Sequence, residues 1–399
     1  MAARCCRNCQ KRCSSPRPAR YRQGVEEPEQ RARRTAALAA CDRVLSHGAA
    51  LSMRDRLTAL AGLGYDLDAL PDVYGDGIVA ELEQKTAGLL GKPSAAFFPT
   101  GIMAQQVGLR LWAARTGNQV VALHPLAHPE QHEDSALSAL TRLRTVHLTT
   151  AARPPSAAEV RDTAELFGTL MLELPLREAG FILPSWDELS AAVQAGRDSG
   201  AVVHFDGARL WECPTHFGRT LEQIAALADS VYVSFYKSLG GLSGAALAGP
   251  EDFVAEAKLW RHRYGGQIFQ QFPAVLAALA GLDHELPKLP SCVTHAAAVA
   301  SALRAGLEPA VPWSRIHPAI PHTHQFAVFL PFSAGVLNAA VMRQAEETRV
   351  SVFRGWTATD LPDVAKTEIT VSAAALDWTA ADVVAATREF VSYLGQPEP

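Results

Sequence analysis

Lysine is scarce in this chain of 399 residues, and neither sign of charge dominates. Only seven of its 37 lysine and arginine residues are lysines, so a lysine within an apolar segment needs an explanation. The net charge of -4 gives no electrostatic basis for binding nucleic acid. No apolar run approaches the roughly 18 residues of a membrane span, and no signal-peptide core follows the N-terminus. We therefore expect a cytoplasmic protein with no nucleic-acid or membrane partner.

Cysteine is unevenly distributed, with four of the seven in the first thirteen residues. These thiols could bind zinc, but a second ligand pair is missing downstream, so a site would have to close without a fold around it. Residues 1–34 carry nine arginines, one lysine and almost no large apolar side chain. Such a segment cannot offset its own ordering entropy, so we predict a disordered, basic, cysteine-containing tail with no metal.

Two short apolar strands in the middle of the chain each lead into a polar residue. The strand predicted over 201–205 runs into Asp206-Gly207-Ala208-Arg209, and the strand predicted over 230–236 runs into Lys237. A helical pattern over 221–228 joins them, which predicts a βαβ unit with parallel strands. Because parallel strands end at one sheet edge, we expect Asp206 and Lys237 to lie close together.

A lysine amine beside a carboxylate at such an edge is what pyridoxal phosphate requires. The cofactor binds covalently to the amine, and the carboxylate keeps the pyridine nitrogen protonated so that the ring can accept electrons. Asp-Gly is also a common turn dipeptide, and lysine is usually a surface residue. Lys237 follows an apolar strand and precedes a glycine-rich bend, however, which favours the cofactor interpretation.

A phosphate site is expected at Thr100 and Gly101, between a predicted strand over 95–98 and a predicted helix over 102–114. Thr100 can cap the helix, whose free N–H groups and dipole attract anions. An ordinary capped helix fits the same residues. Beside Asp206 and Lys237, the phosphate interpretation of Thr100, Gly101 and Ile102 gains weight.

The remaining pattern alternates short apolar runs with amphipathic helices, which predicts an α/β fold with a large, mostly parallel sheet covered on both faces. The strand predicted over 169–174 carries Glu173 near its carboxyl end, and a capping box opens a helix at Ser185. From about Leu282 the pattern becomes α+β, with strands near 324–330 and 367–372 and helices near 334–347 and 380–394. We predict a large cofactor-binding domain over 35–281 and a smaller domain over 282–399.

Three histidines recur every four residues, at His124, His128 and His132. This spacing suits a metal site on a helix, but Pro125 and Pro129 would break that helix. A loop at a strand end is expected instead. A surface histidine or one that stacks on a ring or acts as a general base fits such a loop.

The chain resembles the low-specificity threonine aldolases, a group within the β-eliminating lyase family of fold-type I pyridoxal phosphate enzymes. The resemblance covers roughly Leu45 to the C-terminus. It rests on motifs that occur in the family's order: Asp72-Val73-Tyr74-Gly75-Asp76, Phe98-Pro99-Thr100-Gly101, Ala127-His128 with Glu133, His204 to Arg209, Lys237-Ser238-Leu239-Gly240 and Gly265-Gly266.

The resemblance implies a fold-type I transferase-like architecture, a homodimer or homotetramer, and specific roles for residues. Lys237 would bind the cofactor, Asp206 would pair with its pyridine nitrogen and His128 would stack on its ring. Arg209 would lie near the cofactor oxygen or the substrate carboxylate. Further candidates are Glu173 for the cofactor and Tyr74, Ser46 and Arg177 for the substrate.

Several positions depart from the family pattern. Leu45-Ser46-His47 replaces a serine-aspartate-threonine motif, Ile102 replaces a hydroxyl residue and Tyr236 a serine. Phe269 aligns with an arginine that serves the cofactor phosphate across a subunit interface, and Glu368 with one that binds the substrate carboxylate. These changes leave the Lys237 and Asp206 pair intact and leave the substrate open.

The implied activity is cleavage of a threonine-like β-hydroxy-α-amino acid to glycine and an aldehyde. The alternatives are pyridoxal phosphate-dependent β-elimination on another amino acid, and a pyridoxal-fold protein of reduced activity with a binding or regulatory role.

Overall fold

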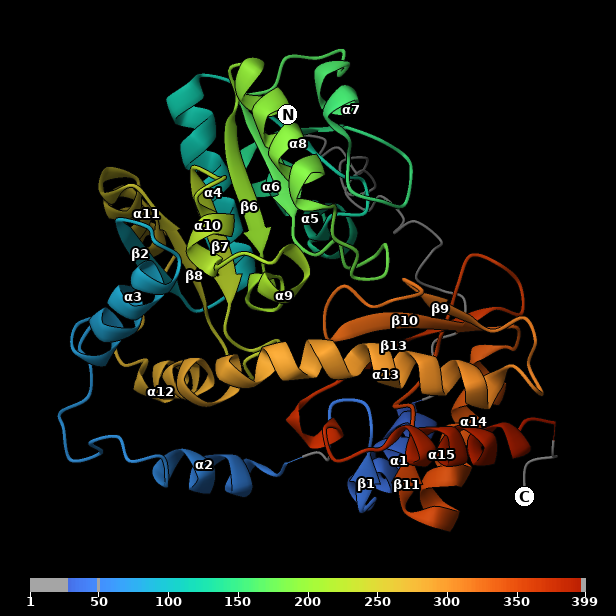
Figure 1. Cartoon of the computed structure of the whole chain (residues 1–399). Coiled ribbons are helices and arrows are strands. Elements are labelled where there is room, and N and C mark those ends of the chain that lie inside the picture. Colours follow the sequence, from blue (N-terminus) through green and yellow to red (C-terminus); the bar gives the residue numbers. More distant parts are fainter. Residues whose placement is uncertain (1–27, 49–50, 396–399) are drawn as a thin grey trace, which may run out of the picture.

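The computed structural model describes residues 28–48 and 51–395, and its largest element is a seven-stranded sheet (Figure 1). Five adjacent strands are parallel, and β8 runs antiparallel to its neighbours β7 and β2. The predicted α/β fold with a mostly parallel sheet is confirmed. In spatial order the strands are β2 (Ser94–Phe98), β8 (Ala245–Gly249), β7 (Ser230–Ser234), β6 (Val202–Gly207), β5 (Thr169–Glu173), β3 (Val120–Leu123) and β4 (Arg144–His147).

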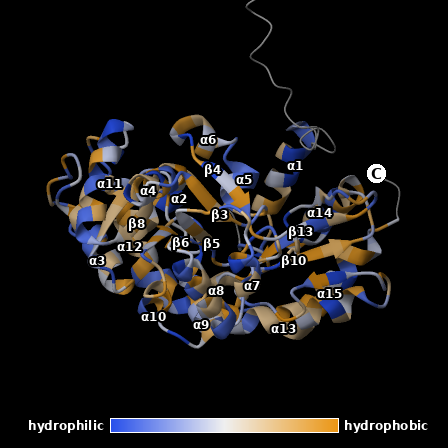
Figure 2. Cartoon of the chain, turned by 90° about the horizontal axis from the view of Figure 1, so that it is seen from above, coloured by the Kyte–Doolittle hydropathy of each residue, from blue (hydrophilic) through white to orange (hydrophobic). Residues whose placement is uncertain are grey.

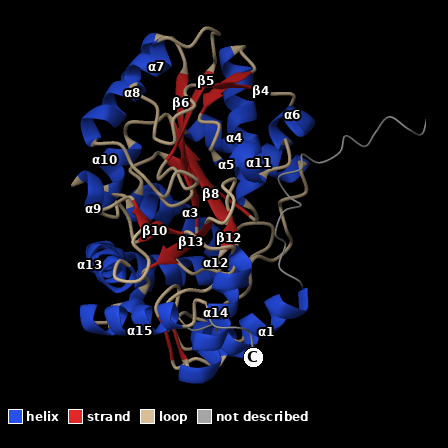
Figure 3. Cartoon of the chain, turned by 90° about the vertical axis from the view of Figure 1, so that its right-hand side faces the viewer, coloured by secondary structure: helices blue, strands red, loops and turns tan. Residues whose placement is uncertain are grey.

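Helices cover both faces of this sheet (Figure 3) because successive side chains of each strand point to opposite sides. Ala95 and Phe97 belong to one apolar cluster with residues of α3 (Ile78–Leu89), α8 (Trp186–Asp198), α10 (Leu221–Ala225) and α12 (Phe272–Ala280). Ala96 and Phe98 pack with α4 (Gly101–Thr116) and α11 (Glu251–Arg263). Shorter helices complete this part: α2 (Met53–Ala61), α5 (His128–His132), α6 (Ala136–Thr141), α7 (Ala157–Arg161) and α9 (Pro214–Phe217).

A second, antiparallel sheet lies at the other end of α13 (Leu289–Leu307), the long helix that crosses the lower half of Figure 1. Its order is β12-β13-β10-β9. Its strands and accompanying helices are β9 (Arg315–His317), β10 (Gln325–Leu330), β12 (Thr357–Ala358), β13 (Ala365–Thr370), α14 (Ala334–Thr348) and α15 (Ala380–Ser392).

The N-terminal segment belongs to the core of this second sheet. Leu38 of α1 (Pro28–Ala39) and Leu45 are buried with Phe326, Val341 and Phe390. Strand β1 (Arg43–Val44) pairs in parallel with β11 (Val350–Ser351), about 300 residues later in the chain. Both chain ends therefore build this second core, and the predicted division at residue 281 stays a prediction.

Part of the predicted disordered tail is ordered. Residues 28–34 form the start of α1, and Arg33 makes a two-pronged ion pair with Glu346 of α14. The composition of the segment concealed this, because the helix depends on a partner far away in sequence. Residues 1–27, including the four clustered cysteines, lie outside the described residues.

In Figure 2 strands such as β10 are coloured mainly as hydrophobic, whereas helices such as α11 and α15 alternate between hydrophilic and hydrophobic stretches. None of the described helices combines the length and the apolar character that crossing a membrane requires.

Candidate active site

A cavity of about 400 Å³ opens at the carboxyl ends of β6 and β7, where parallel sheets usually bind ligands. Six of the predicted site residues line it: Thr100, Gly101, Ile102, His128, Asp206 and Lys237. Pro99 and His132, which were named from the sequence without a role in this site, also line it. So do residues that the sequence did not single out: Gln105, Tyr232, Leu242, Ser243 and Gly244.

The floor of the cavity includes the N-terminus of α4. Thr100 caps this helix by accepting a hydrogen bond from the backbone N–H of Met103. Gly101 lies so close to Tyr232 that a Cβ there would come within 2.1 Å of the tyrosine hydroxyl. Only glycine fits this approach, which places free backbone N–H groups and the positive helix end at the cavity.

Two carboxyl groups meet at the strand ends. Glu173 is the direct neighbour of Asp206 across the parallel β5–β6 pair, and Asp206 accepts a hydrogen bond from the N–H of Ala208. Burial, followed by the negative charge of Asp206, raises the pKa of Glu173 to about 8. Near neutral pH Glu173 is therefore largely protonated.

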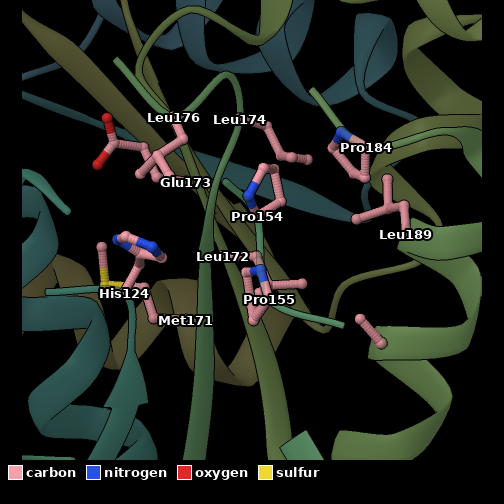
Figure 4. Close-up of a pocket in the computed structure, with 11 residues that line it drawn as sticks. His124, Pro154, Pro155, Met171, Leu172, Glu173, Leu174, Leu176, Pro184 and Leu189 are labelled. Atoms are coloured by element: carbon pink, nitrogen blue, oxygen red, sulfur yellow. The ribbon is translucent and has the colours of Figure 1, made fainter. Parts of the chain in front are cut away.

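Glu173 also fixes two neighbouring segments. Its carboxyl oxygens accept hydrogen bonds from the backbone N–H of His128 at 2.7 Å and of Arg177 at 3.2 Å. A much smaller hollow of about 20 Å³ lies on its other side, with a lining that is largely apolar (Figure 4). In this view the Glu173 carboxyl group points away from Pro154, Pro155 and Leu189. The hollow is too small for a substrate and contributes to the desolvation of Glu173.

Lys237 follows β7 in a bend of the chain, and its side chain reaches the cavity. Burial, with a smaller contribution from the positive charge of Arg209, lowers the pKa of Lys237 to about 8. None of the described side chains forms a hydrogen bond or ion pair with its amine. A partly deprotonated, unpaired amine is a competent nucleophile near neutral pH.

His128 is oriented by a buried acid. Its Nδ1 lies 3.0 Å from Oε1 of Glu133, and Gln106 donates a hydrogen bond to the other oxygen of Glu133. The prediction of a loop around His128 is wrong, because His128 begins the short helix α5. Pro129 is tolerated since it occupies the first turn, where its missing N–H has no intrahelical partner.

The three histidines do not form a metal site. His124 donates from Nε2 to the carbonyl oxygen of Ala151 at 2.8 Å and accepts the N–H of Leu126 at Nδ1, and it is not among the residues that line the cavity. Among residues 28–48 and 51–395, no group of three or more histidine, cysteine, aspartate or glutamate side chains is arranged to hold a metal ion.

Charged residues beside the cavity connect the two sheets. Arg177, in the loop after β5, donates to Glu368 of β13 at 3.0 Å, and Lys366 lies 3.6 Å from the same carboxylate. Glu178 contacts both Lys366, at 3.3 Å, and His132 of the cavity lining, at 2.9 Å. Arg177 is thus neutralised by Glu368.

The remaining predicted residues occupy different places. Arg209 has a buried Nε with no hydrogen-bond partner, and its guanidinium group lies 5.2 Å from the Phe181 ring centroid. Ser46 is buried and its hydroxyl accepts the N–H of Thr370. Tyr74 packs edge-on against Phe269 and is half exposed. Neither Ser46 nor Tyr74 is among the residues that line the cavity.

Comparison with known proteins places most of the chain in one group. Residues 51–312 match the family model described as beta-eliminating lyase. The chain is 28% identical to a low-specificity L-threonine aldolase of Candida albicans, over 54% of this chain and 61% of that protein. It is 29% identical to the corresponding Escherichia coli K12 protein, over 58% of this chain and 71% of that protein. The match to the Candida protein thus spans less than two thirds of its length.

Two solved structures resemble the fold along nearly the whole chain. One is a putative L-allo-threonine aldolase from Listeria monocytogenes, with a TM-score of 0.84 and 32% identity, covering 92% of this chain and all of that one. The other is a putative aromatic amino acid beta-eliminating lyase/threonine aldolase from Exiguobacterium, with a TM-score of 0.83 and 31% identity, covering 90% and 99%.

Proposed function

Because the chain belongs to the beta-eliminating lyase family, we propose that it is a pyridoxal phosphate-dependent carbon–carbon lyase that cleaves a β-hydroxy-α-amino acid to glycine and an aldehyde. One observation carries the proposal. Lys237, Asp206 and the N-terminus of α4 line the same cavity, so an amine, a carboxylate and an anion site face one ligand.

The residues present fit pyridoxal phosphate. The unpaired Lys237 amine provides the covalent attachment, Asp206 provides the partner for the pyridine nitrogen, and the N–H groups after Thr100 provide the phosphate site. Gln105 is buried in the lining with an Nε2 that has no hydrogen-bond partner, which is consistent with a missing ligand. When bound, the cofactor would accept the electrons released at the substrate Cα.

The side chains then divide the proton chemistry between them. Glu173, beside Asp206 at the strand ends, holds a proton near neutral pH because its pKa is raised to about 8. His128 would take the β-hydroxyl proton at Nε2, since Glu133 binds its Nδ1 and stabilises the positive ring that results. Arg209, whose buried Nε has no hydrogen-bond partner, is the cation available for the substrate carboxylate, because Arg177 is paired with Glu368.

β-Elimination from a substrate with a leaving group at Cβ is the second candidate. The observation that favours it is the lowered pKa of Lys237, because an amine with a pKa of about 8 can remove a proton from Cα. The name printed for the Exiguobacterium structure includes both activities.

Products distinguish these functions. The purified protein should be incubated with pyridoxal phosphate and a panel of aliphatic and aromatic β-hydroxy amino acids, and glycine and aldehyde should be quantified directly. Stoichiometric glycine and aldehyde support the lyase proposal. A keto acid with ammonia supports elimination, and binding without turnover on the whole panel supports a binding or regulatory role.

The expected assembly and domain division are part of the proposal. We expect a homodimer or homotetramer, measured as the mass of the holoprotein in solution. We also expect the unit around the small sheet to include residues 28–48 together with the C-terminal residues, because both contribute to one core.

A further inference from the structure

Two consecutive residues hold the segment that carries Lys237. They are Trp211 and Glu212, which belong to the same 3-10 turn, Leu210–Glu212, directly after Arg209. Trp211 donates from Nε1 to the carbonyl oxygen of Ser234 at 2.8 Å. Glu212 accepts a hydrogen bond from the hydroxyl of Ser238. One contact lies before Lys237 and the other directly after it, so this turn fixes the path of the lysine segment.

Glu212 also faces the small sheet. Its Oε1 lies 3.2 Å from Nε2 of His324, and both side chains are almost completely buried. His324 in turn lies with Nδ1 3.0 Å from the carbonyl oxygen of Val371, directly after β13. Val371 pairs with Ser46 of the N-terminal segment. A continuous set of contacts therefore runs from the second core to the residue after Lys237.

The negative charge of Glu212 is maintained against its burial. Burial alone would raise the pKa of Glu212, but His324, Arg209 and Ser238 together outweigh it, and the pKa is lowered. Oε2 of Glu212 has no partner, and Nε2 of His324 is not aligned for a hydrogen bond despite its proximity. A buried contact between a carboxylate and an imidazole with unused hydrogen-bonding capacity gains from a small shift of one partner toward the other.

We propose that Glu212 and His324 are positioning residues that couple the position of the small sheet, relative to the turn Leu210–Glu212, to the orientation of Lys237. The coupling runs through Ser238. This inference rests on the proposed function, because it assumes that Lys237 binds the cofactor. Neither residue is among those that line the cavity, and both act through the segment that they hold.

The test measures cofactor attachment rather than turnover. The rate at which visible absorbance develops after pyridoxal phosphate is added to apoprotein is recorded as a function of pH. For the wild type this rate should rise through a pKa near 8, that of Lys237. Glu212→Gln should loosen the segment and admit water to the amine, raising the apparent pKa by about one unit and slowing attachment near pH 7 by about tenfold.

His324→Gln and Ser238→Ala should shift the pKa in the same direction. The double variant Glu212→Gln/Ser238→Ala should show no larger shift than Glu212→Gln alone, because both changes interrupt one path. The charged groups that act on Lys237 are Arg209, Asp206, Glu173 and Arg177, and all of them are retained in these variants.

The matched control is Glu83→Gln. Glu83 forms a buried ion pair with Arg261 at 3.2 Å but contacts neither the Lys237 segment nor the small sheet. This change should lower the melting temperature and leave the attachment pKa in place. If Glu212→Gln does not fold, His324→Gln and Ser238→Ala still decide the question.

Borohydride reduction separates the two possible failures. If reduction of wild-type holoprotein labels no peptide containing Lys237, the proposed function fails. If Lys237 is labelled and the three single variants attach the cofactor with the wild-type pKa, the link through Glu212 and His324 is overturned.

Discussion

Arg177 and Glu368 form an ion pair between the two sheets, with Nη2 3.0 Å and Nε 3.3 Å from the same carboxylate oxygen. The arginine follows a strand of the large sheet, and the glutamate lies on β13 of the small one. Arg177, a cation beside the cavity, is therefore already paired with a carboxylate of the protein itself.

Glu368→Gln should therefore weaken the hold on Nε and Nη2 of Arg177 and make them available to an amino acid carboxylate, while Nη1 stays paired with Glu178. A charge-assisted hydrogen bond contributes roughly 1.5 to 3 kcal/mol, so the KM for threonine should fall by about tenfold or more. Glu165→Gln breaks the exposed pair with Arg144 and serves as the control. An unchanged KM in steady-state kinetics of Glu368→Gln would show that Arg177 does not bind the substrate.

Lys237→Ala should abolish the visible absorbance of the holoprotein, because no other described lysine lines the cavity. Asp206→Asn should retain some colour but lose turnover, since an amide cannot hold the proton on the pyridine nitrogen. Absorbance spectra and peptide mapping after borohydride reduction measure both effects. Lys258→Ala, on α11, is the control, and retention of colour by Lys237→Ala would contradict the assignment.

Glu133→Gln should reduce turnover and spare cofactor binding. His128 would lose the anion that stabilises its positive ring, and general-base catalysis contributes about 10²- to 10⁴-fold, so kcat should fall by at least tenfold. Glu130→Gln, in the same short helix but facing His147, is the matched control. Equal losses in the two variants would indicate general damage to α5 instead of a role for His128.

Stability should fall in mild acid because of His322. Burial, with His216 and His317 nearby, lowers the pKa of His322 from 6.5 to about 4, and its Nδ1 accepts the N–H of Leu183. The unfolded chain binds this proton more readily, so the stabilisation is present above about pH 6.5 and is lost as the pH falls toward 4.

His322→Gln should remove part of this dependence, by about 1 to 2 kcal/mol after allowance for the partial exposure of the ring. Denaturant unfolding of the apoprotein at several pH values measures the free energy of unfolding without interference from cofactor release. His262→Gln, on the exposed side of α11, should follow the wild type. An identical acid dependence of His322→Gln and wild type would refute the prediction.

Local sequence patterns were sufficient for much of the fold. The strand predicted over 169–174 is β5, and the capping box at Ser185 opens α8 as expected, with Glu188 bonded back to Ser185. The helix predicted to begin after Thr100 is α4. These features depend on residues a few positions apart, so the periodicity of apolar residues and the helix-capping residues determine them.

Features made by distant residues were not predictable in this way. Gln105 reads as one more helix residue, and only the crossing of α4 over β6, where it contacts His204, places it in the cavity. The pairing of Arg177 with Glu368 spans 191 positions. No local signal marks such partners, because their chemistry appears only when the chain is folded.

The parallel pairing of β1 with β11 has a consequence for synthesis. Chains leave the ribosome from the N-terminus, and domains generally fold as units as they emerge. Arg43 and Val44 are made early, yet their partners Val350 and Ser351 come near the end. The strands of the large sheet are all made by Gly249, whereas Leu38 and Leu45 lack their partners until Phe326, Val341 and Phe390 have been made. A nascent chain stalled between these points would present that apolar segment to chaperones.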